Sequence, residues 1–281
     1  MTVYQVFTLI VFLASLVMGT ITQEAQAAEE SSEKSPSNSF GLSASIASTS
    51  SLHQLSDARR TADLSFALMP NAKLPGKINL SVTVAASKDL EGDLETHLLN
   101  PNVFASKSFQ LKPYLSLTPR IGSTLALNED SIKRDSLLGA GHLGFSAGLN
   151  LTRIESIKGL SISFSSMLTR NLHQFTTSRT GSSNTMAALS NSLALAYSLT
   201  EKFVLSAGGS RAIGWTYNKN GDLKNSYALS QSLTYAVNSK ISADIGHTVG
   251  GAAYKENGIE SAIELFDENQ SMLFGSLTVS I

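Results

Sequence analysis

The chain has 281 residues, of which 42% are hydrophobic, only 15% are charged and none is cysteine. The charged fraction is well below the roughly 25% of an ordinary soluble domain. A formal net charge of −1 gives no indication of nucleic-acid binding. The lack of cysteine excludes a disulfide framework, a Cys-ligated zinc site and an N-terminal lipidated cysteine.

The first 27 residues have the features of a cleaved signal peptide. Residues 6–19 form a nearly unbroken apolar run, which is shorter than the ~20 residues that a helix needs to span a bilayer. Ala25 and Ala27 supply small residues for a cleavage site, so we expect the mature chain to begin near Ala28. The alternative is a membrane anchor helix, against which the short run argues. Residues 28–38 are polar and Ser-rich, and they predict a disordered leader.

From residue 39 to the end of the chain, hydrophobic residues recur with a period of two. In residues 78–84, for example, Ile, Leu and Val alternate with Asn, Ser and Thr. Successive side chains of a strand point to opposite faces, so each such segment has one apolar and one small, polar face. About twelve segments show the pattern, at about the length expected of tilted membrane strands. They cover residues 40–46, 62–68, 78–84, 109–117, 125–127, 143–151, 160–168, 189–199, 203–207, 227–237, 241–249 and 273–281.

The connections between these segments alternate in length. Short ones are expected at residues 71–76, 119–123, 153–159, 200–202 and 238–240. Longer, more polar ones are expected at residues 47–60, 87–106, 128–136, 170–184, 212–225 and 251–270. This pattern predicts an all-β fold over residues 39–281: a closed, antiparallel, up-and-down transmembrane β-barrel of about twelve strands. Closure removes the sheet edges that lipid cannot satisfy. A soluble sandwich or barrel is the alternative, but its surface would carry more Lys and Glu.

Five residues fit a membrane barrel poorly. Pro113 would lie inside a strand, where it cannot donate a ladder hydrogen bond. Asn191, Arg211, Gln231 and His247 would face lipid. Local β-bulges, which reverse the facing of side chains, are one explanation for these polar residues.

With this pattern, the chain resembles the bacterial outer-membrane β-barrel proteins over about residues 39–281. Residues 273–281 (LFGSLTVSI) carry the terminal alternation that, in that family, the barrel-assembly machinery reads. Ile281 stands where the family usually has Phe. The resemblance implies export to the bacterial outer membrane, with outer-membrane lipids and the barrel-assembly machinery as partners.

We expect no enzyme activity, cofactor or metal site. Residues 139–144 fit G-x-G-x-x-G, but alternating strand residues follow them instead of the helix that a dinucleotide site requires. The five histidines are scattered without metal-ligand spacing. Twelve-stranded barrels include an outer-membrane phospholipase family whose members resemble one another in a His followed two residues later by the catalytic Ser, and no His in this chain has that neighbour.

The expected inward faces are rich in small hydroxyl side chains, which favours an open, wet lumen. Twelve strands lie between eight-stranded barrels, which side chains fill, and sixteen-stranded porins. The candidate pore-lining residues are Asp63, Lys77, Lys112, Arg120, His142 and Asp244.

Such sparse, mixed charge predicts a passive, weakly selective channel for small polar solutes. Two alternatives remain open: a structural or surface-interaction barrel that binds partners through its long loops, and an outer-membrane enzyme with an unrecognised site. The leader or residues 87–106 could also fold inward as a plug.

Overall fold

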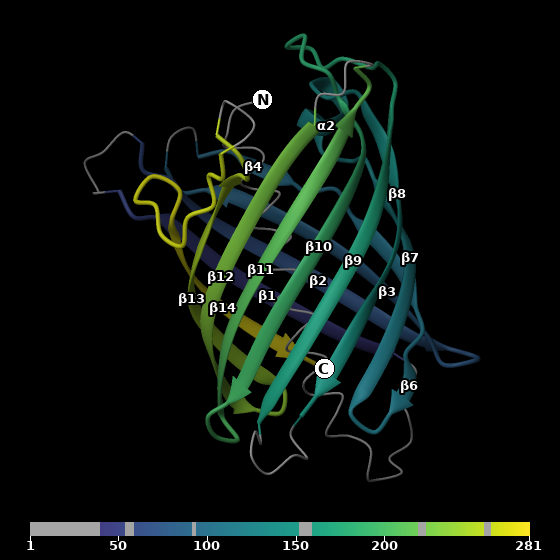
Figure 1. Cartoon of the computed structure of the whole chain (residues 1–281), viewed down its shortest axis with the longest axis vertical. Coiled ribbons are helices and arrows are strands. Elements are labelled where there is room, and N and C mark those ends of the chain that lie inside the picture. The colour runs from purple at the N-terminus through teal and green to yellow at the C-terminus, as the bar shows by residue number, and fades with distance from the viewer. Residues whose placement is uncertain (1–39, 54–58, 92–93, 152–158, 219–222, 256–259) are drawn as a thin grey trace.

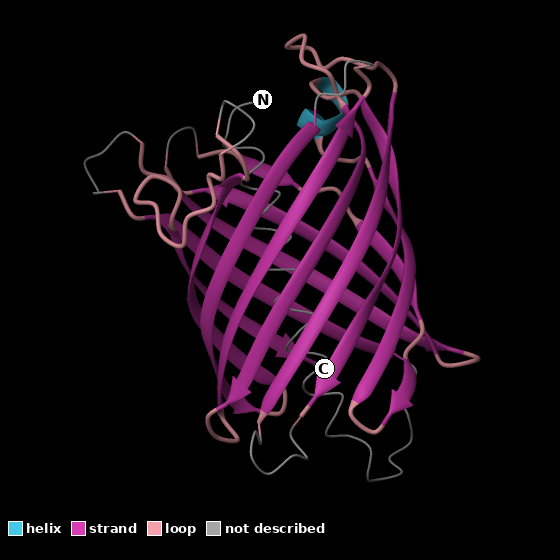
Figure 2. Cartoon of the chain, in the orientation of Figure 1, coloured by secondary structure: helices cyan, strands magenta, loops and turns pink. Residues whose placement is uncertain are grey.

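The computed structural model describes residues 40–53, 59–91, 94–151, 159–218, 223–255 and 260–281. The expected signal peptide and polar leader lie outside the described residues. The described chain is almost entirely β-strand (Figure 2). The elements are β1 (Phe40–Ser51), β2 (Ala62–Leu74), β3 (Ile78–Asp89), β4 (Thr96–Leu98), β5 (Asn102–Ser106), β6 (Phe109–Lys112), β7 (Leu115–Leu125), α2 (Glu129–Lys133), β8 (Leu137–Asn150), β9 (Leu160–His173), β10 (Thr185–Ser198), β11 (Phe203–Thr216), β12 (Leu223–Asn238), β13 (Ile241–Ala252) and β14 (Met272–Ser280). No helix among the described residues is long and apolar enough to cross a bilayer.

The strands pair with their neighbours along the chain and close into a barrel (Figure 1). β5 and β6 both pair with β7 and together make one interrupted strand. Closure joins β1 to β14, with Ser43 opposite Ser280 and Ser51 opposite Met272. Beyond that pairing, Leu42 and Ile281 exchange two backbone hydrogen bonds of 3.1 and 2.8 Å. The prediction of a closed, antiparallel, twelve-stranded barrel is therefore confirmed.

The period of two in the sequence becomes a separation of chemistry between the two faces of the wall. Large apolar side chains lie on the outer face, where Ile121, Leu143 and Ile245 expose 61%, 62% and 65% of their surface. Ser and Thr occupy many of the alternate positions on the inner face. In water this arrangement would leave a wide apolar belt exposed, whereas in a bilayer the same belt contacts acyl chains.

One strand differs from the expectation. Residues 109–117 are two strands, β6 and the start of β7, joined by a tight turn that contains Pro113. The predicted turn at residues 119–123 was wrong, because these residues lie within β7. The apolar residues on both sides of the turn face outward, so the alternation runs through it without a visible interruption.

Pro119 lies within β7, and the structure accommodates it by a break in the neighbouring strand. Lys107 and Ser108 separate β5 from β6 opposite Pro119. The Lys107 N–H still donates to the Pro119 carbonyl at 3.2 Å. The missing N–H of Pro119 therefore falls where the ladder is already interrupted.

The β-bulge explanation for the outward polar residues was also wrong. Asn191 pairs with Arg211, and Gln231 with His247, within uninterrupted ladders. The register shifts of these strands lie near their ends, at residues 185–187 and 236–238. The four polar side chains therefore face outward.

Candidate pore lining and outer wall

The inner wall is built mainly from small hydroxyl side chains that hydrogen-bond to one another across the strands. Ser165 and Ser192 lie 2.7 Å apart, and Ser43 and Ser280 lie 3.0 Å apart, measured between their Oγ atoms. These short side chains satisfy neighbouring groups while taking little volume from the lumen. The wall is thus polar without being strongly charged.

Both candidate acidic residues accept hydrogen bonds from inward hydroxyls. Asp244 on β13 accepts hydrogen bonds from Thr234 and, at 3.0 Å, from Ser276. Asp63 on β2 accepts from Thr49 at 3.3 Å. These partners hold each carboxylate against the inner wall.

Arg120 and His142 belong to one inward cluster with the aromatic ring of Phe104. The Arg120 guanidinium lies 5.8 Å from the Phe104 ring centre, within the range of a cation–π contact. The ring centres of Phe104 and His142 are 5.4 Å apart. Thr124 and Thr169 contact the two ring nitrogens of His142 at 2.6 and 3.0 Å, which fixes the orientation of the imidazole.

Asp244 and Arg120 lie on opposite walls of the barrel. The order of strands places β7 and β13 six steps apart in either direction around the ring of twelve. The inner surface therefore carries an arginine on one side and an aspartate on the opposite side.

The other two candidates lie at the short-turn end instead of within the wall. Lys77 occupies the β2–β3 turn with a φ of 61°. Lys112 is the last residue of β6, and its Nζ lies 6.0 Å from the Tyr114 ring centre. Both are exposed, so they contribute charge to the mouth of the barrel.

Sequence reasoning missed Phe104 and a second inward group at the long-loop end. Asp89 pairs with Asp63, and His97 Nε2 lies 3.5 Å from Asp89 Oδ2. Asp89, His97 and Phe104 all lie within residues 87–106, where the sequence predicts a long connection. The β-branched and aromatic residues Val103 and Phe104 were the available signal for a strand, but the segment NVFAS covers only five residues and does not alternate.

At the long-loop end, hydrogen bonds of the Asn184 side chain connect the β7–β8 and β9–β10 loops; we call this contact the Asn184 latch. Asn184 is 6% exposed, and its Nδ2 donates to the carbonyl oxygens of Asp135 at 2.9 Å and Phe175 at 3.0 Å. The Asp135 carboxylate in turn hydrogen-bonds to Arg134 and raises the pKa of that guanidinium.

On the outside of the barrel, the β13–β14 loop packs against the wall beside β12 and β13 (Figure 1). The Tyr227 hydroxyl accepts a hydrogen bond of 3.1 Å from the Glu264 N–H, and Tyr227 is only 3% exposed. The His247 ring stacks on Phe266 with 5.9 Å between ring centres. The loop therefore covers part of the outward polar surface.

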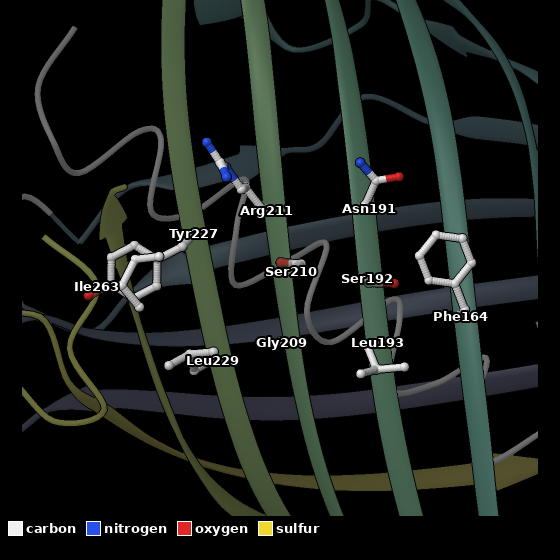
Figure 3. Close-up of a pocket in the computed structure, with 10 residues that line it drawn as sticks. All are labelled: Phe164, Asn191, Ser192, Leu193, Gly209, Ser210, Arg211, Tyr227, Leu229 and Ile263. Atoms are coloured by element: carbon white, nitrogen blue, oxygen red, sulfur yellow. The ribbon is translucent and has the colours of Figure 1, made fainter. Parts of the chain in front are cut away.

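Beside this loop, an apolar hollow opens on the outer wall (Figure 3). Its volume is about 290 Å³. Gly209 forms its floor between Leu193 and Leu229, and Arg211 and Asn191 lie at its edge. Arg211 Nη2 donates to the hydroxyl of Tyr254 at 2.7 Å, so the loop also positions the guanidinium.

No family model matches the chain, and no curated protein is similar to it in sequence. Among solved structures, the fold is similar to an outer membrane channel from Pseudomonas putida F1, with a TM-score of 0.57 and 10% identity over 89% of this chain and 100% of that one. It is also similar to the NanC porin, with a TM-score of 0.52 and 9% identity over 85% of this chain and 98% of that one. The chain thus has the fold of the outer-membrane β-barrel channels.

Proposed function

We propose that the protein is a passive channel of the bacterial outer membrane for small polar solutes. The main support for this proposal is the inner wall, where small Ser and Thr side chains line a closed barrel of twelve strands. Such side chains offer hydrogen bonds to a passing solute and leave space around the barrel axis. The fold shared with a porin and an outer membrane channel supports the same function.

We propose weak selectivity for this channel. The inward charges Asp63, Asp89, Arg120 and Asp244 are of both signs, and hydrogen bonds to the wall hold Asp63 and Asp244. A ring of like charges, which would select strongly for one sign of ion, does not occur among the described inward residues.

Single-channel recording of the refolded protein in a planar bilayer tests this proposal. Discrete, reproducible current steps are expected, with ohmic behaviour and no requirement for an energy source. Silence from protein that is shown to be folded by its faster gel migration before heating would overturn the channel and leave the barrel as a binding or structural protein.

We further propose that the protein reaches the outer membrane after cleavage of residues 1–27. Intact-mass measurement of protein from the membrane fraction is expected to give a chain that starts near Ala28. A mass that retains Met1 would contradict the cleavage.

The second candidate function is partner binding through the long loops. The observation that favours it is the Asn184 latch, which orders two of these loops into a fixed surface. Folded protein that forms no pores would favour this function over the channel.

A further inference from the structure

In a membrane, as proposed above, Arg211 would place a positive charge on the lipid-facing side of the barrel, which is unfavourable. It faces outward from β11 on the long-loop side of that strand's middle. Arginine on the lipid face of a barrel is most destabilising at the bilayer midplane and less so toward the interface. No carboxylate of the described residues forms an ion pair with Arg211. An anion from the membrane would remove the remaining cost.

Around Arg211, polar side chains lie on the long-loop side of the apolar hollow. Asn191 and Ser166 continue the polar row across the two neighbouring strands, since Arg211 pairs with Asn191 and Asn191 with Ser166. On the short-turn side of this row, Leu193 and Leu229 flank the hollow over Gly209 (Figure 3). Polar groups toward the loops and apolar groups toward the membrane centre match the order of a lipid molecule in the outer leaflet.

The hollow is small, and its lining is mainly apolar. Its volume of about 290 Å³ is just below the roughly 300–1,000 Å³ of small-molecule pockets, which is enough for part of one lipid tail. Ile263 of the β13–β14 loop forms part of its lining, and Tyr227 beneath the loop is buried. Residues of the loop therefore form one side of the hollow.

We propose that the outer wall binds a phosphate-bearing lipid of the outer leaflet at this hollow. The Arg211 guanidinium and the Asn191 amide hold the lipid phosphate, and one acyl chain lies over Gly209. Tyr254 supports the site by fixing the guanidinium through its hydroxyl and its ring, whose centre is 5.4 Å from the Arg211 Cζ atom. The inference rests on the proposed membrane location but does not require the lumen to conduct.

Native mass spectrometry of the refolded protein tests the site with lipid A, a bisphosphorylated, acylated disaccharide, in detergent micelles. Dephosphorylated lipid A and inorganic phosphate are the comparison ligands. The wild-type protein is expected to retain lipid A and to bind dephosphorylated lipid A and free phosphate much more weakly. Arg211→Gln is expected to weaken retention roughly tenfold, the equivalent of one charge-assisted hydrogen bond.

Two further variants separate the hollow from a general effect of charge. Gly209→Val fills the hollow while Arg211 stays in place; the added Cβ would lie 2.9 Å from the Cδ2 end of the flexible Leu229 side chain. It is expected to weaken lipid retention as well. The matched control is Arg170→Gln, since Arg170 is also outward and lies 5.9 Å from the Tyr217 ring centre but does not line the hollow. This control is expected to retain lipid like the wild type.

Three results would overturn the lipid site: unchanged retention in Arg211→Gln, equal loss in Arg170→Gln, or lipid-free dimers that the Arg211 and Gly209 variants dissociate. The last result would identify the hollow as an interface between copies of the chain. The faster gel migration of unheated protein checks folding, and if Gly209→Val fails to fold, Arg211→Gln still decides. Conductance is recorded on the same samples, so a barrel that binds lipid without conducting refutes the channel alone.

Discussion

At the scale of single residues, a glycine on β7 allows the inward aromatic cluster to form. A Cβ at Gly122 would lie 2.3 Å from Cδ1 of Phe104 and 2.5 Å from the backbone oxygen of Val103. The hydrogen at this position therefore lets the Phe104 ring lie against the wall, where it contacts Arg120 and His142.

We predict that Gly122→Ala destabilises the barrel by about 1–3 kcal/mol, the usual cost of forcing extra volume into a packed site. Part of the clash is with backbone, which cannot move aside as a side chain does. Urea unfolding of the protein refolded in micelles measures the effect. Gly141→Ala is the matched control, because nothing lies within 4 Å of a Cβ at Gly141. Equal stability of the two variants would contradict the packing described for Phe104.

A second prediction concerns the charges on opposite walls. Arg120→Gln is expected to shift the reversal potential toward cation preference, and Asp244→Asn toward anion preference. Each shift corresponds to a permeability ratio changed by roughly fivefold, the equivalent of the ~1 kcal/mol between unit charges 4 Å apart in water. Ser192→Ala, an inward change without charge, serves as the control. Shifts of the same sign in both charge variants would show that neither residue faces the permeating ion.

Alternation in the sequence is sufficient to place a residue on one face of a strand, but it fails at the turns. Asp63, Arg120 and Asp244 share the inward face with Ser and Thr, whereas Lys77 and Lys112 lie at turns, where the period of two no longer determines direction. Sequence alone could not place Phe104, because its strand is short and follows a long irregular stretch.

At the scale of elements, asparagine side chains connect the long loops through hydrogen bonds. Asn100 Oδ1 accepts hydrogen bonds from the N–H groups of Leu127 and Asn128 at 2.8 and 2.7 Å. Asn128 in turn caps α2 by accepting from the Ser131 N–H. Amide side chains suit this position because each can accept from one loop and donate to another.

We predict that Asn184→Ala loosens the β7–β8 and β9–β10 loops without opening the barrel. The variant leaves the Asp135 carbonyl without its donor and the Phe175 carbonyl with only the Ser136 hydroxyl, at a cost of about 1–3 kcal/mol. Trypsin is therefore expected to cleave after Arg134 and Arg179 several-fold faster, while the gel shift of the unheated protein stays unchanged. Thr180→Ala, at the exposed tip of the same loop, is the control. An unaltered cleavage rate would mean that Asn184 does not join the loops.

The interrupted strand shows why element boundaries were harder to predict than the number of elements. The two-residue turn between β6 and β7 lies between segments whose apolar residues both face outward, so the pattern reads as one strand. Pro113 was in fact the signal of this turn. Pro119 gave a false signal, because its strand partner is broken opposite it.

At the scale of the whole molecule, alternation and the alternating connection lengths predicted the closed barrel, since both are local properties of the sequence. The packing of the β13–β14 loop on the outer wall is different. It depends on contacts such as Arg211 with Tyr254 and His247 with Phe266, which are distant in sequence or obey no period. The outward polar residues were visible in the sequence, but their partners were not.

Closure itself can be tested, because the chain contains no cysteine. Ser43 and Ser280 are register partners on the first and last strands, and antiparallel partners lie about 4.5–5.5 Å apart at Cα, within disulfide range. We predict that Ser43→Cys with Ser280→Cys oxidises to a cross-link in the folded barrel, seen as faster gel migration of boiled, non-reduced protein.

The control pair is Ser43→Cys with Ser165→Cys, whose strands β1 and β9 lie six steps apart around the barrel. Both pairs consist of inward serines, so reactivity and exposure are similar and only the distance across the lumen differs. No cross-link is expected in the control. If neither pair cross-links, the first and last strands do not meet, and lipid would face two open strand edges whose backbone groups it cannot satisfy. If both pairs cross-link, the wall moves too freely to enclose a defined lumen.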